Sequence, residues 1–428
     1  MRSEPLRWLL ERKGEVMSMA GVVGSPLVGL LAGVVTVRHL TPEQVGALNI
    51  AALWPAYLGF LHFGTLTGMA RQLPLSIGAG DEKNARHILG ITTSIVWRTS
   101  ALGALTCLFL SWYLGWRNHD ELLGLALMVG AITVLSNNYV LQVDTALRSY
   151  GRFQRYGVNQ MLSNLVGLLS LPLVVVQGAL GAVGRLAIVG VAAIVTRSGT
   201  GFLQSSEKLN WREIRQLCSV GFPLLISGMF FTYLMMADRS IVALMLSRAE
   251  IGYFSLSAII VNSLQFLPQA LSMIVFPKMA RVYGASHDPR ALRPYVLKTL
   301  WLNLLTLLPI SLGAYALLPY AIQNYFPAYV AGIRAGQIAC LTSVFWVYLG
   351  MGSVFGVMNR MRAYLTVLAV SIGLVWGGGY VLISRGYGIE GAALARLLAT
   401  MLICAFTIWY SLRLTGQAGV TTKATANA

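Results

Sequence analysis

Charged residues are scarce in this sequence. They make up only 11% of its 428 residues, whereas soluble domains carry about 25%. Hydrophobic residues make up 56%, and the mean hydropathy is +0.67, so a soluble core could not bury all of the apolar surface. The scarcity of charge excludes a soluble globular protein. The net charge of +17 does not indicate a nucleic-acid partner either, because most Lys and Arg residues lie in short segments between apolar runs.

The motifs of common enzyme sites are missing as well. The four cysteines show no CxxC and no metal-ligand spacing, which predicts small buried hydrophobic residues. HExxH, a P-loop, a dinucleotide fingerprint and a Ser/His/Asp cluster are all absent from the sequence. We therefore predict a protein that is not an enzyme, with no catalytic residue, no metal site and no cofactor.

Long apolar runs are what the sequence does contain. Runs of 18 or more apolar residues are typical of transmembrane helices, and these runs lack the alternation of barrel strands. The prediction is an all-α integral membrane protein with about twelve spans. The predicted spans are 16–37, 45–67, 88–114, 121–143, 158–177, 179–202, 218–246, 252–276, 296–318, 329–357, 364–384 and 388–412.

The positive charges predict the orientation of these spans. Of the 32 Lys and Arg residues, 23, Arg197 among them, are assigned to the termini and the even-numbered loops, and only five to the odd-numbered loops. Because cytoplasmic loops are enriched in Lys and Arg, both termini are predicted to be cytoplasmic. The opening stretch MRSEPLRWLLERKGEVM mixes basic and acidic residues without a signal-peptide core, so residues 1–15 are predicted to form an amphipathic helix at the inner surface.

The two halves of the sequence repeat each other at nearly one offset, 206 to 210 residues. LTPEQVGALNIAA (40–52) matches LSRAEIGYFSLSA (246–258), and GALGAV (178–183) matches GIEGAA (388–393). Met69-Ala70-Arg71 likewise matches Met279-Ala280-Arg281. Six spans in each half predict two lobes in the same orientation, related by an axis along the membrane normal. The predicted parts are an N-terminal lobe over 16–205, a linker over 206–217, a C-terminal lobe over 218–412 and a cytoplasmic tail over 413–428.

Five charged residues lie deep inside the predicted spans, away from the span ends: Arg98, Arg185, Asp238, Arg239 and Arg396. Arg98 lies about ten residues, roughly 15 Å, into its span, near the bilayer centre. A charge there costs about 2.5–3.5 kcal/mol even on lenient scales. Each arginine could snorkel or pair with a protein group, and Arg185 and Arg396 are close enough to the outer face to do so.

The sum of these charges, four positive against one negative, predicts a cavity that attracts anions. The forked donors of arginine match phosphate oxygens. We nominate Arg98, Arg185, Arg239 and Arg396 as substrate-binding residues and Asp238 as the residue that couples transport to an ion.

Several stretches of the second half resemble a known family. GFPLLISGMFF, ADRSIVALMLSRAEIGYFSLSA, LPQALSMIVFPKMARVYG and RGYGIEGAALARLLA are similar to polysaccharide flippases of the Wzx type, within the multidrug/oligosaccharidyl-lipid/polysaccharide exporter superfamily. The resemblance covers essentially the whole chain. It implies a MATE-like fold of two six-helix lobes around a cationic cavity. The family's aspartate–arginine pair matches Asp238 and Arg239, whereas the other three arginines are nominated from the residues alone.

The resemblance also implies a substrate and a mechanism. The substrate would be an oligosaccharide on a polyprenyl pyrophosphate, moved from the cytoplasmic to the outer leaflet of a bacterial inner membrane by alternating access. Its implied partners are membrane lipids, a polysaccharide polymerase and a chain-length regulator. Two alternatives remain open. A cation or drug antiporter of the same superfamily would favour unpaired carboxylates over arginines, and a membrane-embedded polymerase or ligase would favour a large outer loop.

Overall fold

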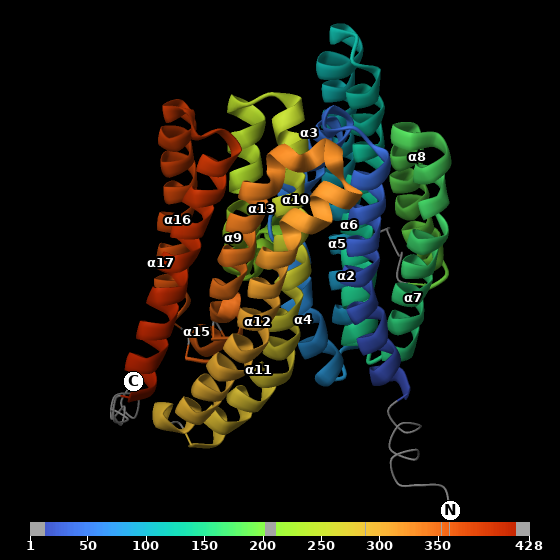
Figure 1. Cartoon of the computed structure of the whole chain (residues 1–428). Helices are drawn as coiled ribbons and strands as arrows, with labels where there is room; N and C mark the ends of the chain where they lie inside the picture. The colour runs from blue at the N-terminus through green and yellow to red at the C-terminus, as the bar shows by residue number, and fades with distance from the viewer. Residues whose placement is uncertain (1–12, 202–210, 287, 352, 359, 417–428) are drawn as a thin grey trace, which may run out of the picture. The chain divides into compact units, whose positions relative to one another are not determined.

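A computed structural model describes residues 13–201, 211–286, 288–351, 353–358 and 360–416. All regular elements among these residues are helices (Figure 1), which confirms the predicted all-helical class. The predicted surface helix over 1–15 lies largely outside the described residues, as does most of the tail over 413–428.

The helices are long and follow one another with short connections. The first half contains α2 (Lys13–His39), α3 (Pro42–Leu58), α4 (Thr65–Gly78), α5 (Glu82–Leu110), α6 (Glu121–Ser149), α7 (Phe153–Leu169) and α8 (Leu171–Ser198). The second half contains α9 (Trp211–Met245), α10 (Arg248–Leu264), α11 (Phe266–Ser286), α12 (Arg293–Tyr325), α13 (Ile333–Val344), α14 (Tyr348–Met351), α15 (Ser353–Val357), α16 (Met361–Leu382) and α17 (Gly388–Gly416). Short 3-10 or π turns connect several of them.

Nine stretches of the described helices are long and apolar enough to cross a membrane. Each of the twelve predicted spans falls on helical segments. The number of long apolar stretches in the described helices, nine, is smaller than the number of predicted spans for two structural reasons. The stretch 361–416 contains two predicted spans. Helices α7 and α10, of 17 residues each, are shorter than the roughly 20 residues of a typical transmembrane helix.

The second span of each half is interrupted. The predicted span 45–67 is divided among α3, a 3-10 turn over Gly59–His62 and α4, with left-handed Phe63 and Gly64 between them. The buried ring of His62 accepts a hydrogen bond from the Gly64 N–H at 3.3 Å. In the second half, the predicted span 252–276 is divided between α10 and α11. Interrupted helices at membrane depth are tolerated where protein surrounds them or where they line a cavity.

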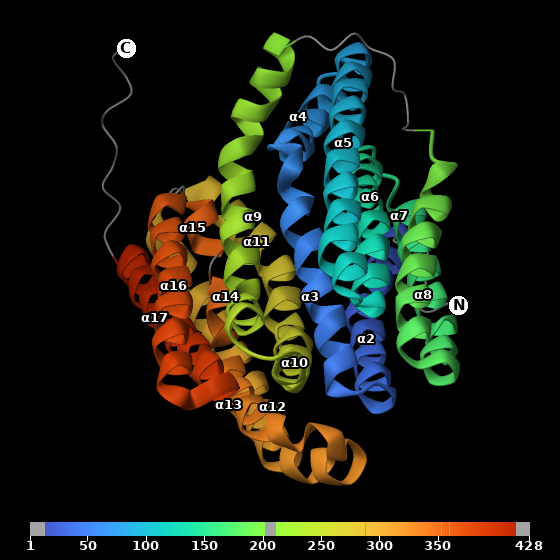
Figure 2. The ribbon, with the colours of Figure 1, turned by 90° about the horizontal axis from the view of Figure 1, so that it is seen from above.

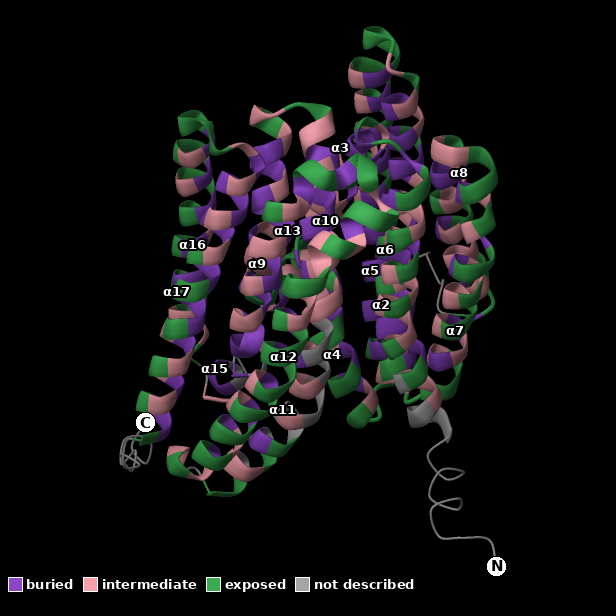
Figure 3. Cartoon of the chain, in the orientation of Figure 1, coloured by how far each residue is buried: buried purple, intermediate pink, exposed green. Residues whose placement is uncertain are grey.

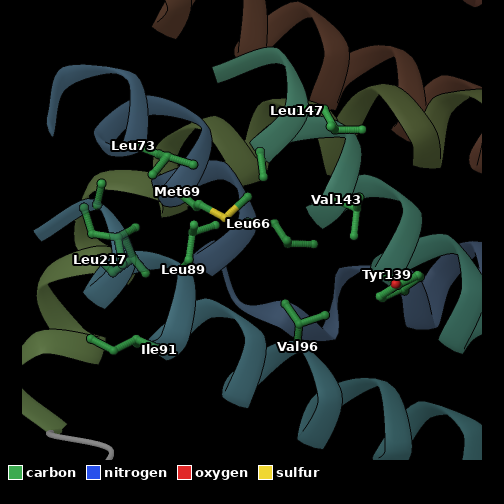
Figure 4. Close-up of a cluster of buried hydrophobic side chains, with 13 residues drawn as sticks. Leu66, Met69, Leu73, Leu89, Ile91, Val96, Tyr139, Val143, Leu147 and Leu217 are labelled. Carbon is green, nitrogen blue, oxygen red and sulfur yellow. The ribbon is translucent and has the colours of Figure 1, made fainter. Parts of the chain in front are cut away.

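The chain divides into two compact units, residues 1–233 and 234–428. Helix α9 runs through this division, so its first part belongs to unit 1 and its last part to unit 2. Residues 211–217, predicted as part of a linker, form the start of α9, while 206–210 lie outside the described residues. The start of α9 belongs to unit 1 because Leu217 packs into the core of that unit, with residues of α4, α5 and α6 (Figure 4).

Glycines allow α9 to approach α4 closely within unit 1. A Cβ on Gly221 would collide with the Gly64 carbonyl oxygen, and one on Gly68 would collide with the Leu217 carbonyl oxygen. The Thr67 hydroxyl donates to the Gly221 carbonyl oxygen at 2.8 Å in the same contact. Small residues at helix interfaces permit this backbone-to-backbone packing in membranes.

Local structure repeats between the halves at the predicted offset. Thr41 caps α3 and Ser247 caps α10, and both residues form complete capping boxes, with Gln44 and Glu250 as reciprocal partners. The cap residues share their backbone conformation, with φ/ψ of −71°/158° and −70°/162°. The sequence match between 40–52 and 246–258 therefore reflects a repeated helix start.

In unit 2, α16 and α17 lie side by side in both views (Figures 1 and 2), and α17 also packs on α13. Buried and exposed residues alternate around the helices of each unit (Figure 3), and many of the exposed residues are large and apolar, Leu, Val, Trp and Tyr among them. Exposed apolar faces of this extent are typical of helices that face lipid.

Candidate functional site

Two of the predicted site residues meet inside unit 2. Arg396 lies eight residues after the start of α17 at Gly388, and Asp238 lies on α9. The Arg396 Nη1 is 3.6 Å from the Asp238 Oδ1, and the two residues are only 3% and 8% exposed. Each charge therefore has an opposite charge nearby, which lowers the cost of burying it.

The Arg396 guanidinium has few hydrogen-bond acceptors around it. Its Nη1 donates to the Leu234 carbonyl oxygen, and its Nη2 donates to the Met235 sulfur at 3.2 Å, a weak acceptor. The Asp238 carboxylate, at 3.6 Å, lies beyond hydrogen-bond distance. The buried Nε has no partner in the described part of the chain. Arginine carries five N–H donors, so this group retains unused donor capacity.

Trp346, which lies against Arg396, and Tyr348, which stacks on Trp346, add further donors. The guanidinium carbon lies 5.5 Å from the centre of the Trp346 ring, a cation–π contact. The Trp346 and Tyr348 rings stack at 5.7 Å. Both side chains are fully buried, and neither the indole nitrogen nor the phenol oxygen has a hydrogen-bond partner among the described residues.

The backbone departs from a regular helix at these aromatic residues. The predicted span 329–357 contains α13, a 3-10 turn over Phe345–Val347, then α14 and α15. The turn carries Trp346, and α14 begins at Tyr348. Interruptions of this kind inside spans often mark functional sites.

Arg239 follows Asp238 in α9 but occupies different surroundings. It is half-buried, and its backbone N–H donates to the Asp238 Oδ1 at 2.9 Å. Consecutive helix residues point about 100° apart, so the Arg239 side chain leaves α9 in a different direction from that of Asp238.

The other two predicted arginines lie in unit 1. Arg185, on α8, is half-buried, and its Nη2 donates a long 3.4 Å hydrogen bond to the Gly167 carbonyl oxygen. Its buried Nε has no partner in the residues that the structure describes. Arg98 is exposed on α5, on the same helix face as Leu102 and Leu105. Among the described residues, Arg98 and Arg185 share no hydrogen-bond partner.

A buried ion pair in unit 1 was not predicted. Arg197 donates from Nε and Nη2 to the two oxygens of Asp144, at 2.8 and 3.0 Å. The Gln160 side-chain oxygen and the Ser163 hydroxyl accept further hydrogen bonds at 2.7 and 3.1 Å. Together with backbone and hydroxyl oxygens of its own helix, these acceptors saturate the guanidinium.

This pair corrects two assignments. Arg197, counted as a cytoplasmic loop residue, is 1% exposed within α8. Asp144 lies one residue beyond the predicted end of its span but is buried in α6, so Asp238 is not the only buried carboxylate in these helices. Asp144 and Arg197 each lie at the end of an apolar run of the sequence, and this position was the available signal of their burial. The sequence could not pair two residues 53 positions apart.

Unit 1 also contains a small apolar cavity of about 170 Å³ between α3, α6 and α8. Alanine, leucine, valine, proline and glycine line most of it, and Thr133 and Asn137 are its polar residues. None of the predicted site residues line this cavity. Among the described residues, no group of three or more His, Cys, Asp or Glu side chains could hold a metal ion.

Comparison with known sequences places these features in a family. The family model described as "Polysaccharide biosynthesis protein" matches residues 38–327, more than half of the chain. A curated relative, the "Probable multidrug resistance protein NorM" of Rhodopseudomonas palustris, is 24% identical over 213 residues. That alignment covers 48% of this chain and 44% of the relative, so the match spans less than half of the relative's length.

Solved structures share the fold over nearly the whole chain. An inward-facing MATE family multidrug resistance transporter of the MOP superfamily has a TM-score of 0.74 at 15% identity, covering 91% of this chain and 94% of that one. The lipid II flippase MurJ in an inward closed conformation has a TM-score of 0.69 at 14% identity, covering 94% and 90%. A MOP superfamily transporter of Pyrococcus furiosus has a TM-score of 0.63 at 15% identity, covering 94% of each chain.

Proposed function

This chain belongs to the family of polysaccharide biosynthesis proteins and has the MOP transporter fold, and from this premise we propose that it is a lipid-linked oligosaccharide flippase. Its substrate is an oligosaccharide on a polyprenyl pyrophosphate, which it moves from the cytoplasmic to the outer leaflet by alternating access. We place it in the bacterial inner membrane with both termini in the cytoplasm, as the distribution of Lys and Arg indicates. A polysaccharide polymerase and a chain-length regulator are its proposed partners.

The observation that carries this proposal is the incomplete saturation of two arginines. Arg185 and Arg396 lie in membrane-spanning helices, and each has a buried Nε without a partner in the described part of the chain. Arg197 shows that the same fold can saturate a guanidinium that has a structural role. Unused arginine donors in an apolar environment favour an oxyanion ligand, and phosphate oxygens match their forked geometry.

The membrane potential would assist such a substrate. A bacterial cytoplasm is electrically negative, so each negative charge that moves outward gains about 2.3 kcal/mol per 100 mV. We propose Asp238 as the residue that couples this movement to an ion, because its carboxylate is the anionic partner of Arg396.

Transport by the purified protein in liposomes tests the proposal. The assay follows the movement of a polyprenyl-pyrophosphate-linked sugar to the opposite leaflet. Arg98→Ala, Arg185→Ala and Arg239→Ala should each slow transport by roughly tenfold or more, since each removes one charge-assisted contact. Arg334→Ala is the matched control, because that side chain is 78% exposed, and it should transport at the wild-type rate.

Two results would reject the proposal. One is wild-type transport by all three variants. The other is resistance of a pump-deficient strain to cationic drugs, conferred by the wild-type protein without any movement of lipid-linked sugar. The second result would identify a drug transporter, and the Rhodopseudomonas palustris relative is named as a probable multidrug resistance protein.

A further inference from the structure

Unit 2 contains a buried group of hydrogen-bond donors that lack acceptors. We propose that Arg396, Trp346 and Tyr348 form an oxyanion site, and that Asp238 is the internal counter-ion that an incoming phosphate displaces. This inference rests on the proposed function for the source of the oxyanion, the pyrophosphate head of the lipid-linked substrate. It adds two residues, Trp346 and Tyr348, that the distribution of charge could not reveal.

The first support is the imbalance between donors and acceptors. Three neighbouring side chains are at least nine-tenths buried, and each presents an N–H or O–H without a partner among the described residues: the Arg396 Nε, the Trp346 Nε1 and the Tyr348 hydroxyl. A buried donor without an acceptor is costly. Proteins rarely leave such groups unpaired unless a ligand, ion or water satisfies them. The group contains three donors, so the missing partner is an acceptor.

The second support is the contrast with the ion pair of unit 1. Asp144 accepts two hydrogen bonds from Arg197, at 2.8 and 3.0 Å, as a bidentate structural pair. Asp238 instead lies 3.6 Å from the Arg396 Nη1, too far to hydrogen-bond. Asp238 therefore neutralises the guanidinium without occupying its donors. A carboxylate held in this way can be exchanged for a better-fitting anion.

The third support is the position of the group in the chain. Trp346 lies in the 3-10 turn that interrupts the predicted span 329–357, and Tyr348 begins the short helix α14. The Trp346 ring lies against the guanidinium, and the Tyr348 ring stacks on Trp346 at 5.7 Å. Interrupted spans are the places where transporters build substrate sites.

The exposures of the two side chains place the approach to the proposed site on the side of Asp238. Its side chain is 12% exposed, whereas that of Arg396 is 3% exposed, so the carboxylate is the outermost part of the pair. Rotation of Asp238 away from Arg396 would uncover the guanidinium. A pyrophosphate oxygen would then accept hydrogen bonds from Arg396 and from the two aromatic donors.

Binding and thermal stability of the purified full-length protein test this site. The probes are inorganic pyrophosphate and a short-chain polyprenyl pyrophosphate. Tyr348→Phe removes only the hydroxyl, and it should weaken binding of both probes by about tenfold, the value of one hydrogen bond to a charged group. The control is Tyr380→Phe, which removes a hydroxyl from a residue that is 61% exposed on α16, and it should bind like the wild type.

Stability separates a binding role from a structural one. Without ligand, Tyr348→Phe should unfold at the wild-type temperature or above it, because it removes a buried donor that lacks an acceptor. The rise in Tm caused by pyrophosphate should shrink in the same variant. Asp238→Asn removes the competing anion and should bind inorganic pyrophosphate about tenfold more tightly. Asp81→Asn, at the exposed cap of α5, controls for the change in net charge.

Three results would overturn the site. These are wild-type pyrophosphate affinity in Tyr348→Phe, weaker binding in Asp238→Asn, and a loss of affinity confined to the polyprenyl probe, which would indicate recognition of the lipid tail. The proposed function is tested separately. If Tyr348→Phe weakens pyrophosphate binding while the wild-type protein moves no lipid-linked sugar, the oxyanion site stands and the proposed substrate is rejected.

Discussion

Gly178 and Gly388 adopt the same backbone conformation at equivalent places in the two halves of the chain. Their φ/ψ values are 58°/−127° and 50°/−134°. A Cβ on Gly181 would collide with the Leu173 carbonyl oxygen. A straight helix would hold residues eight apart at about 12 Å, so the chain reverses direction at Gly178. The predicted boundary between the spans 158–177 and 179–202 coincides with this reversal.

Alanine at either glycine should destabilise the protein. The positive φ with negative ψ is a conformation that only glycine adopts readily, so we expect a loss of about 1–3 kcal/mol for Gly178→Ala and for Gly388→Ala. Thermal unfolding in detergent measures the effect. Gly184→Ala is the control, since this helical glycine has open space around it, and it should leave Tm unchanged or raise it slightly. Equal Tm values for Gly178→Ala and Gly184→Ala would contradict the assigned reversal.

The close approach of α9 and α4 predicts a large effect from one methyl group. Gly221→Ala places a Cβ against the Gly64 backbone, so it should reduce the yield of folded protein severalfold through overpacking. The control is on the same helix, because a Cβ on Gly228 meets nothing within 4 Å. Gly228→Ala should therefore fold normally. Size-exclusion profiles of the two variants, expressed side by side, compare the folded yields, and a normal profile for Gly221→Ala would disprove the contact.

The ion pair of unit 1 should behave as a structural element. Removing one partner leaves a buried charge unpaired, so Asp144→Asn or Arg197→Met should cost about 3–5 kcal/mol. The double variant should lose less than the sum of the two single losses, because neither charge then remains unpaired. Unfolding midpoints of the four proteins form the double-mutant cycle. Additive losses would show that the two residues do not interact.

Arg185 should matter for transport and not for stability, the opposite of the ion pair between Asp144 and Arg197. Its buried Nε has no partner in the described residues, and the hydrogen bond of its Nη2 to the Gly167 carbonyl oxygen is long, at 3.4 Å. Arg185→Gln should therefore leave Tm unchanged or raise it, while transport of lipid-linked sugar in liposomes falls by roughly tenfold. A marked drop in Tm together with unchanged transport would assign Arg185 a structural role like that of Arg197.

The sequence by itself determined the class of this protein. Scarce charge and long apolar runs require membrane-spanning helices, because lipid offers the backbone no other hydrogen-bond partners. It also determined the repeat, since the residue types of Thr41 and Ser247 favour helix caps and those of Gly178 and Gly388 favour a positive φ. Capping and positive-φ positions depend on a few neighbouring residues, so a sequence match can reveal them.

Only the tertiary structure decided which charged residues meet. The charges inside the predicted spans gave no sign that Arg396 of α17 lies beside Asp238 of α9, because contacts between helices depend on the rotation and packing of each helix. The same limit hid Asp144 and Arg197, which lie at the ends of different helices. It also hid Trp346 and Tyr348, whose sequence is that of an ordinary apolar span and whose unpaired donors become apparent only when their surroundings are known.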